Sequence, residues 1–281
     1  MKWLIPAKTF LLGEYVAITG GSAIILTTAP CFKLSLTERE EQSSIHPDSP
    51  AGKWWSKAQC KDTFLRWHDP YQERGGLGAS SAQFLGSYWA ACHVHQKIPD
   101  EQSMLEAYYQ SSWSGEGLRP SGYDVIAQAR KGCVYINKLN NTVQSYHWPF
   151  KDLSFLILHT GVKLATHQHL LHTALPTEIN DMSRVVDEAK LAFEHQDSEQ
   201  LVNAINQYHQ ILSSLNLVAE HSMNMINALK ANSEIIAIKG CGALGSDTLL
   251  ILTKRQNLQT LRKKMEDEGW KIVASEEELT S

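Results

Sequence analysis

GGLGASSA, at residues 75–82, leads directly into a stretch with the apolar periodicity of a helix. The apolar residues at that spacing are Phe84, Leu85, Tyr88, Trp89 and Cys92. Glycines let a backbone turn approach a bound group closely, and the first turn of a helix offers free N–H groups at the positive end of the dipole. Ser80 and Ser81 add hydroxyls that can cap the helix, hold phosphate oxygens or ligate Mg²⁺. The segment taken alone predicts either a phosphate-binding loop or an ordinary Gly/Ser helix cap.

A second glycine-rich segment, KGCGALGSD at residues 239–247, contains the pattern G-x-G-x-x-G after a predicted strand. That pattern is typical of dinucleotide-binding folds only where a helix follows it. Residues 248–253 have the pattern of a strand instead. A glycine-rich turn between two strands is therefore the better interpretation, and a plain hairpin turn is its simplest form. Neither glycine segment ends in G-K-[ST], which excludes a P-loop by pattern.

Two further segments place a charged residue beside turn signals. PSGYDV, at residues 120–125, precedes a predicted helix and puts Asp124 in its first turn. A carboxylate there can serve only the helix dipole, or it can take part in chemistry. PAKTFLLGEYVA, at residues 6–17, places Lys8 between two predicted short strands. Each segment has an ordinary structural explanation alone, so the specificity lies in their combination.

Together these segments resemble the motifs of the GHMP kinases, the superfamily of galactokinase, homoserine kinase, mevalonate kinase and phosphomevalonate kinase. Residues 6–17 resemble the first motif, "PGK-x-x-LFGEY-AV", residues 76–82 the second, "GLGSSAA", and residues 242–247 the third, "GAGGGD". The order and spacing agree, and the resemblance covers nearly the whole chain. Ala7 departs from the pattern by replacing a usual glycine. Leu244 and Ser246 replace glycines of the third motif, which predicts a stiffer loop.

Several details look most like phosphomevalonate kinase. SGYDV, at residues 121–125, is similar to that family's "GSG-x-DVA", and Asp247 fits the same branch. TGVKLAT, at residues 160–166, looks like its "TG-x-x-AST" segment. Pro120 is instead typical of mevalonate kinases, whose motif tends to read "PSG-x-DN".

The resemblance implies an α+β architecture, the two-domain GHMP kinase fold. A ribosomal-protein-like ATP-binding domain would occupy residues 1–151, and a ferredoxin-like domain would occupy residues 152–281. The active site would lie in the cleft between the two domains.

The resemblance also implies roles for individual residues. Asp124 would be the catalytic carboxylate that orients the attacking oxygen or accepts its proton, and Lys8 would neutralise charge on the acceptor and the transferring phosphoryl. Ser80 would ligate Mg²⁺. The phosphates of ATP would lie on Gly76, Leu77, Gly78, Ala79, Ser80 and Ser81. The acceptor would contact Lys8, Ser121, Gly122, Lys163, Gly242, Ala243 and Asp247, with the loop at residues 242–247 closing over it.

The function so implied is the ATP- and Mg²⁺-dependent phosphorylation of phosphomevalonate to diphosphomevalonate, a step in making isoprenoid precursors. Mevalonate is the alternative acceptor. A GHMP-fold ATP-dependent decarboxylase stays open as well, and release of CO₂ and inorganic phosphate would distinguish it. So does a non-catalytic GHMP protein, which Leu244 and Ser246 suggest and the retained Lys8, Ser80 and Asp124 oppose.

The composition agrees with a small-molecule enzyme. The chain has 281 residues, 43% hydrophobic and 20% charged, with a net charge of −4 and no long basic run, so we expect a small anionic substrate and no nucleic acid. No apolar stretch approaches the roughly 18 residues of a membrane span, so no membrane association is expected. Five scattered cysteines without a CxxC pair favour a reducing, cytoplasmic compartment. We expect a monomer or a homodimer.

The periodicity predicts the elements as follows. Short strands at residues 3–5, 10–12, 23–28 and 32–37 precede a mostly irregular segment at 38–70. A helix begins near residue 123 and ends at Gly132, and a strand follows at 134–136. After a strand at 155–158, amphipathic helices cover about 178–195, 198–215 and 218–230. The remaining order is strand, turn, strand, helix, strand, ending near residue 274.

Overall fold

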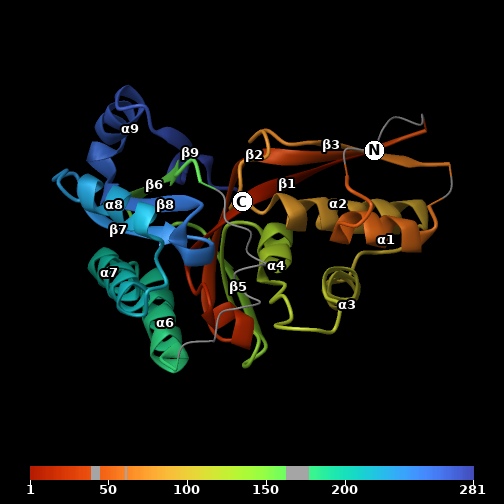
Figure 1. Ribbon diagram of the computed structural model, residues 1–281, viewed down its shortest axis with the longest axis horizontal. Coiled ribbons are helices and arrows are strands. Elements are labelled where there is room, and N and C mark those ends of the chain that lie inside the picture. The colour runs from red at the N-terminus through yellow and green to blue at the C-terminus, as the bar shows by residue number, and fades with distance from the viewer. Residues whose placement is uncertain (39–44, 61, 163–176) are drawn as a thin grey trace.

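A computed structural model describes residues 1–38, 45–60, 62–162 and 177–281 of the protein. Its strands form two sheets that lie side by side, each with its own helices, as Figure 1 shows. The first sheet and helices α1 to α3 occupy one half of the molecule, and the second sheet with helices α6 to α9 occupies the other. The α+β class predicted from the sequence is confirmed.

The first sheet is antiparallel and has the order β1-β2-β4-β5, with β3 paired to the outer end of β2. Its strands are β1 (Lys2–Leu12), β2 (Ala23–Thr37), β3 (Phe64–His68), β4 (Cys133–Asn137) and β5 (Thr142–Tyr146). Its helices are α1 (Pro50–Ala58), α2 (Ala79–Val94), α3 (Glu101–Ser112) and α4 (Tyr123–Arg130). Helices α1 to α3 pack on one face of the outer part of the sheet, where Ile5 and Phe32 meet Phe84 and Tyr88. Helix α4 also packs on the first sheet, against β2 and β4, and it lies near the middle of the molecule (Figure 1).

The second sheet has the order β7-β8-β6-β9 with antiparallel pairs throughout, which is the ferredoxin-like arrangement. Its strands are β6 (Leu153–His159), β7 (Ile235–Cys241), β8 (Thr248–Lys254) and β9 (Lys271–Ser275). Helices α6 (Ile179–His195) and α7 (Ser198–Ser214) cover one face, and α8 (Glu220–Leu229) and α9 (Leu258–Asp267) the other. Side chains alternate along β6 accordingly: Phe155 faces α6 and α7, whereas Leu156 faces α8 and α9.

One apolar core joins the two halves. Leu11, Leu12, Ile24 and Leu26 of the first sheet belong to the same buried cluster as Phe155 and the inner face of α6. We call this cluster the shared core. The expected join at residues 149–152 falls between β5 and β6. The division into two domains at residue 151 stays a prediction.

Three sequence expectations were wrong and one strand was missed, for local reasons. The two predicted strands around Pro6 are one strand, β1, with an irregularity in its register between Ile5 and Ala7. Residues 23–37 are likewise one strand, β2. The segment at 38–70 contains α1, which starts at Pro50 after Ser49 caps the amide of Gly52, and it also contains β3. Strand β5 was missed because its residues, three partly buried and two exposed, show no clear alternation.

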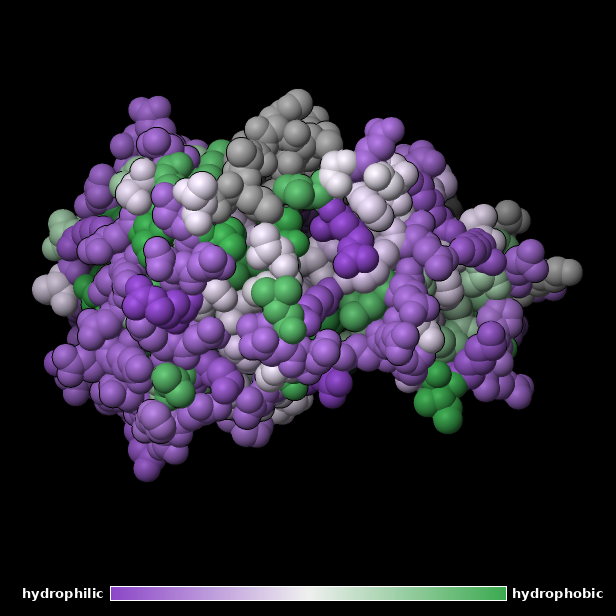
Figure 2. Space-filling view, turned by 90° about the horizontal axis from the view of Figure 1, so that it is seen from below, coloured by the Kyte–Doolittle hydropathy of each residue, from purple (hydrophilic) through white to green (hydrophobic). Residues whose placement is uncertain are grey.

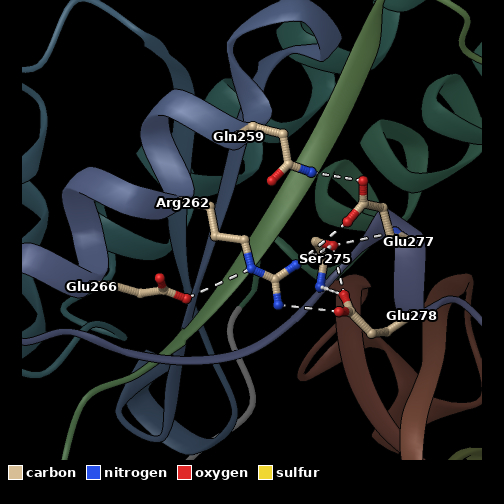
Figure 3. A network of polar contacts seen from close by, with 6 residues as sticks. All are labelled: Gln259, Arg262, Glu266, Ser275, Glu277 and Glu278. Atoms are coloured by element: carbon tan, nitrogen blue, oxygen red, sulfur yellow. Dashed lines mark hydrogen bonds and ion pairs between the residues drawn. The ribbon is translucent and has the colours of Figure 1, made fainter.

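The last described turn, η4 (Glu276–Glu278), is fastened to α9 by a polar network (Figure 3). Arg262 of α9 lies 3.1 Å from Glu278, 3.5 Å from Glu277 and 3.8 Å from Glu266. Glu278 accepts hydrogen bonds from the backbone N–H and the hydroxyl of Ser275, which caps the turn. The backbone then reaches the first sheet, where the amide of Thr280 donates to the carbonyl of Thr27 at 2.9 Å.

The surface agrees with these burial patterns. In Figure 2 hydrophilic residues cover most of the face seen from below, and hydrophobic residues reach it only in small groups. Within the part of the chain that the structure describes, no helix combines the length and apolarity that crossing a membrane requires.

Candidate active site

Lys8 and Asp124 form an ion pair at the centre of the molecule. Lys8 Nζ lies 3.2 Å from Asp124 Oδ2, and the two side chains are 10% and 31% exposed. Lys8 projects from the middle of β1, and Asp124 lies in the first turn of α4, whose N-cap is Gly122. The exposed part of the Asp124 carboxylate can contact a bound molecule while its other side faces the Lys8 ammonium group.

The glycine loop before α2 packs directly against this pair. The amide of Lys8 donates to the carbonyl of Leu77 at 3.0 Å. Gly78, the N-cap of α2, has a φ of 80°, and a Cβ on it would lie 2.6 Å from Lys8 Cγ. Glycine is therefore required at this position both by conformation and by the close approach of β1. The N-terminus of α2 carries no side-chain cap, which leaves its first amide groups available to an anion.

The two serines of the loop have different surroundings. Ser81 is buried, and its hydroxyl donates to the carbonyl of Gly78 at 2.9 Å. Ser80 is exposed, and among the described residues no hydrogen bond is found for its hydroxyl. Of the two, Ser80 is thus the one whose oxygen is accessible to a bound group. Its role as a Mg²⁺ ligand stays a prediction.

The turn between β7 and β8 reaches the same place from the other half of the molecule. The turn runs through Gly242 and Ala243 to Asp247, which is 3% exposed. A Cβ on Gly76 would lie 2.3 Å from Asp247 Cβ, so the two glycine-rich segments touch. The backbone of Asp247 also pairs with the end of β6, because Thr160 N–H donates to its carbonyl at 3.1 Å. The expected glycine-rich turn between two strands is confirmed.

The third-motif turn is held rigidly. Leu244 has a φ of 53°, a left-handed conformation that glycine adopts more easily. Its N–H donates to the hydroxyl of Tyr15 at 3.1 Å, and its carbonyl accepts from Ala219 N–H at 2.8 Å. These contacts fix the turn to the first motif on one side and to the start of α8 on the other.

The structure brings together most of the residues singled out in the sequence. Lys8, Asp124, the loop at residues 76–81 and Asp247 form one continuous cluster through the contacts above. Ser121 and the N-cap Gly122 immediately precede α4, whose first turn carries Asp124. Lys163 lies outside the described residues, and its predicted contact with the acceptor therefore stays a prediction.

A partly buried lysine supports the loop that precedes Asp124. Lys138 donates hydrogen bonds to the hydroxyl of Tyr109 and to the carbonyl of Ser121, and its ammonium group lies over the rings of Tyr109 and Tyr123. Burial, reinforced by the charge of Arg119, lowers the pKa of Lys138 to about 8. Sequence patterns gave no sign of this residue, because it follows β4 and reaches the loop only through the fold.

An ion pair links the two halves beside the cluster. Lys239 of β7 is fully buried, and its Nζ lies 2.5 Å from Glu14 Oε1, which follows β1. Burial alone lowers the pKa of Lys239, but the Cys241 sulfur and the Glu14 carboxylate outweigh it, so that the pKa lies above its ordinary value. Tyr208 of α7 adds a hydrogen bond of 2.6 Å from its hydroxyl to the carbonyl of Glu14.

No family model matches the chain, and neither does the sequence of any curated protein. Solved structures do match. The mevalonate kinase of Methanococcus jannaschii aligns with 100% of this chain and 98% of its own at 17% identity and a TM-score of 0.76. The phosphomevalonate kinase of Streptococcus pneumoniae, in complex with phosphomevalonate and AMPPNP, covers 98% and 99% at 13% identity and a TM-score of 0.80. The galactokinase of Lactococcus lactis, complexed with galactose, covers 98% and 92% at 11% identity and a TM-score of 0.73.

The chain has the GHMP kinase fold. The likeness covers 98–100% of this chain and 92–99% of these structures, so the fold includes both sheets and the segments that carry the three motifs. Because sequence identity is only 11–17% in these pairs, the comparison bears on the arrangement of the backbone and leaves the chemistry to the residues of this chain.

Proposed function

We propose that the protein is an ATP-dependent kinase of a small anionic acceptor, and that this acceptor is phosphomevalonate. The observation that carries the proposal is the Lys8–Asp124 ion pair, set against a glycine loop at an uncapped helix N-terminus. A carboxylate, an ammonium group and a phosphate-binding loop in contact are the parts that phosphoryl transfer needs. The GHMP kinase fold supports the same reading.

ATP would bind with its phosphates on the N-terminus of α2. Gly76 and Gly78 let Asp247 and Lys8 pack closely against this loop, and Ser80 presents its hydroxyl from the exposed side of the first turn. Mg²⁺ would be held by Ser80 together with phosphate oxygens, and it would neutralise charge on the phosphates. Ser80 suits this role because it is exposed and no hydrogen bond is found for its hydroxyl among the described residues. Those residues contain no group of three or more His, Cys, Asp or Glu that could hold a metal by itself. A Mg²⁺ ion bound mainly through a nucleotide needs only one or two protein ligands.

In the transfer an oxygen of the acceptor forms a bond to the γ-phosphorus while the bond from that phosphorus to the departing ADP oxygen breaks. Lys8 Nζ, fixed at 3.2 Å from Asp124, is placed to neutralise charge that grows as these bonds change. If the acceptor atom is a hydroxyl oxygen, Asp124 takes its proton. If it is a phosphate oxygen, already ionised at neutral pH, Asp124 only orients it and the positive charge of Lys8 contributes more.

Phosphomevalonate is chosen over mevalonate on two sequence features that the fold places at the cluster. Residues 121–125 precede and begin α4, and Asp247 packs on Gly76. Both match the phosphomevalonate kinase pattern better than the mevalonate kinase pattern. A coupled assay of ADP release with mevalonate, phosphomevalonate, diphosphomevalonate, homoserine and galactose tests the choice. If kcat/KM is highest with mevalonate, mevalonate is the acceptor instead of phosphomevalonate. If CO₂ is released, the protein is a decarboxylase and the kinase assignment is wrong.

We expect Mg²⁺-ATP, but not NAD⁺, to raise the melting temperature. A ligand that binds only the folded state stabilises it by about 2.7 kcal/mol at 100 times its dissociation constant. Thermal unfolding with each ligand at equal concentration measures the effect, and Mg²⁺ alone is the control. A shift with NAD⁺ and none with Mg²⁺-ATP would instead favour a dinucleotide site at the turn of residues 240–245.

Lys8→Met is expected to lower kcat by about 10²-fold while the dissociation constant for Mg²⁺-ATP changes only a few-fold. Lys8 faces Asp124, whereas the α2 N-terminus that would hold the phosphates uses backbone groups. Calorimetric titration of ATP and steady-state kinetics on the same variant separate the two effects. Normal turnover together with lost ATP affinity would place Lys8 in the nucleotide site.

A further inference from the structure

Gln128 is a buried polar residue in the first half of the molecule that none of the sequence motifs includes. It lies on α4 with no exposed surface, four residues after Asp124. Residues four apart on a helix share a face, so Gln128 lies one turn below the carboxylate and points to the same side of α4. Burying a primary amide is unfavourable unless its hydrogen bonds are made, so its partners matter.

Its amide group joins two other segments of the cluster. Gln128 Nε2 donates to the carbonyl of Pro6 at 2.8 Å and to the carbonyl of Gly78 at 3.1 Å. Both partners are acceptors only, so the NH₂ end must face them and the orientation of the amide is fixed. Pro6 lies at the irregularity in β1, where it has no partner residue in the register with β2. Gly78 is the N-cap of α2.

The side chain of Lys8 packs into the same contact. A Cβ on Gly78 would lie 2.6 Å from Lys8 Cγ, 3.1 Å from Lys8 Cε and 3.0 Å from Gln128 Nε2. The stem of Lys8, the Gly78 backbone and the Gln128 amide therefore touch one another. The Gln128 side chain thus connects α4, the helix that carries Asp124, to β1 two residues before Lys8 and to the N-cap of α2.

We infer that Gln128 is a positioning residue for phosphoryl transfer: it fixes Lys8 and Asp124 relative to the glycine loop through its two hydrogen bonds. The catalytic consequence of this inference rests on the proposed function. The contact among the three segments is observed in the structure and is independent of that function. These segments also meet through the Lys8 amide, which donates to Leu77, and through the Lys8–Asp124 ion pair. Gln128 is the side chain that bonds to β1 and to the α2 N-cap at once, so removing its amide lets the three segments shift relative to one another. Displacements of about 1 Å at reacting groups can lower rates by up to about 10²-fold.

The test compares Gln128→Met with a matched control, Asn137→Leu. Methionine keeps the length of glutamine but cannot donate to Pro6 or Gly78. Asn137, the last residue of β4, is another buried amide in the same half of the molecule and is 5% exposed. It donates to Ser22 Oγ at 2.9 Å and accepts from Asn140 N–H at 3.1 Å. Neither of those bonds involves Lys8, Asp124 or the glycine loop. The control therefore loses a buried amide without loosening the cluster.

Two measurements are made on the full chain. With Mg²⁺-ATP and phosphomevalonate, Gln128→Met is expected to lower kcat by about 10- to 10²-fold with KM for ATP changed less than about threefold, and Asn137→Leu to keep kcat near that of the unmodified protein. Amide hydrogen exchange without any ligand is expected to accelerate in residues 6–9 and 77–82 of Gln128→Met, and to stay unchanged there in the control.

Unchanged kcat in a folded Gln128→Met protein, or an equal loss of kcat in both variants, would overturn the inference. Unchanged exchange at residues 6–9 and 77–82 would overturn it as well. If the unmodified protein turns over none of the acceptors in the assay panel, the proposed function fails, and hydrogen exchange still decides whether Gln128 holds the three segments together.

Discussion

Asp124→Asn is expected to lower kcat by about 10²- to 10⁴-fold, the range found when a positioned acid or base is removed. Asparagine keeps the size of the side chain but loses the charge that pairs with Lys8 at 3.2 Å, and with it the fixed geometry that orients the acceptor oxygen. Where the acceptor atom is a hydroxyl oxygen, asparagine also cannot accept its proton. Because Asp124 is 31% exposed and lies in the first turn of α4, the fold should survive. Steady-state kinetics with Mg²⁺-ATP and phosphomevalonate, and the melting temperature, measure the two effects.

Asp181→Asn is the matched control for this change. Asp181 also lies in the first turn of a helix, α6, and is 69% exposed beside Arg184. Losing it removes the same favourable interaction with a helix dipole, about 0.3–1 kcal/mol, without touching the cluster. Turnover of Asp124→Asn equal to that of the control would remove Asp124 from the mechanism.

Lys239→Met is expected to lower the free energy of unfolding by about 3–5 kcal/mol, the usual effect of removing one partner of a buried ion pair. Lys239 has no exposed surface and Glu14 is 7% exposed, so the substitution leaves a carboxylate buried without its cation. The pair also spans the two halves of the molecule, which makes its loss weaken their contact. Urea unfolding followed by circular dichroism measures the change.

The double substitution Glu14→Leu with Lys239→Met separates the ion pair from its surroundings. Replacing both charges with apolar side chains is often close to neutral in stability, because no unpaired charge remains. We therefore expect the double variant to recover most of the stability that Lys239→Met loses. A double variant no more stable than the single one would show that packing around Lys239 or Cys241, rather than the unpaired Glu14, causes the loss.

The long helices and the second sheet could be predicted from the sequence because their apolar residues recur with a clear period. Helices α6 and α7 begin and end within one residue of the predicted bounds. The first sheet was harder. Pro6 and Pro30 interrupt the strand pattern, yet β1 and β2 continue through them, because tertiary pairing overrides a local signal. Helix α1 begins at a proline in a polar segment, and its Ser49 cap is visible only in retrospect.

For the candidate site, the sequence identified the residues that motifs contain and missed those that only the fold brings near. Lys8, Asp124 and the glycine loop meet as the resemblance implied. Gln128, Lys138 and the partnership of Glu14 with Lys239 could not be found, because each depends on contacts between segments far apart in the chain. A buried amide or ammonium group has no pattern of its own in a sequence, and its partners are set by packing.

The shared core has a consequence for synthesis of the protein on the ribosome. All strands of the first sheet have been synthesised once Tyr146 has been added. The apolar side of the sheet that carries Leu11, Leu12 and Ile24 is covered only by α6 and α7, and α7 ends at Ser214. Until then the nascent chain carries an uncovered apolar surface, the kind that attracts chaperones or other nascent chains. The carbonyl of Thr27 in β2 receives its hydrogen bond from the Thr280 amide even later, when the end of the sequence has been made. Folding should therefore finish late, and a pause in translation between residues 146 and 214 would expose the chain to misassembly more than a pause after it.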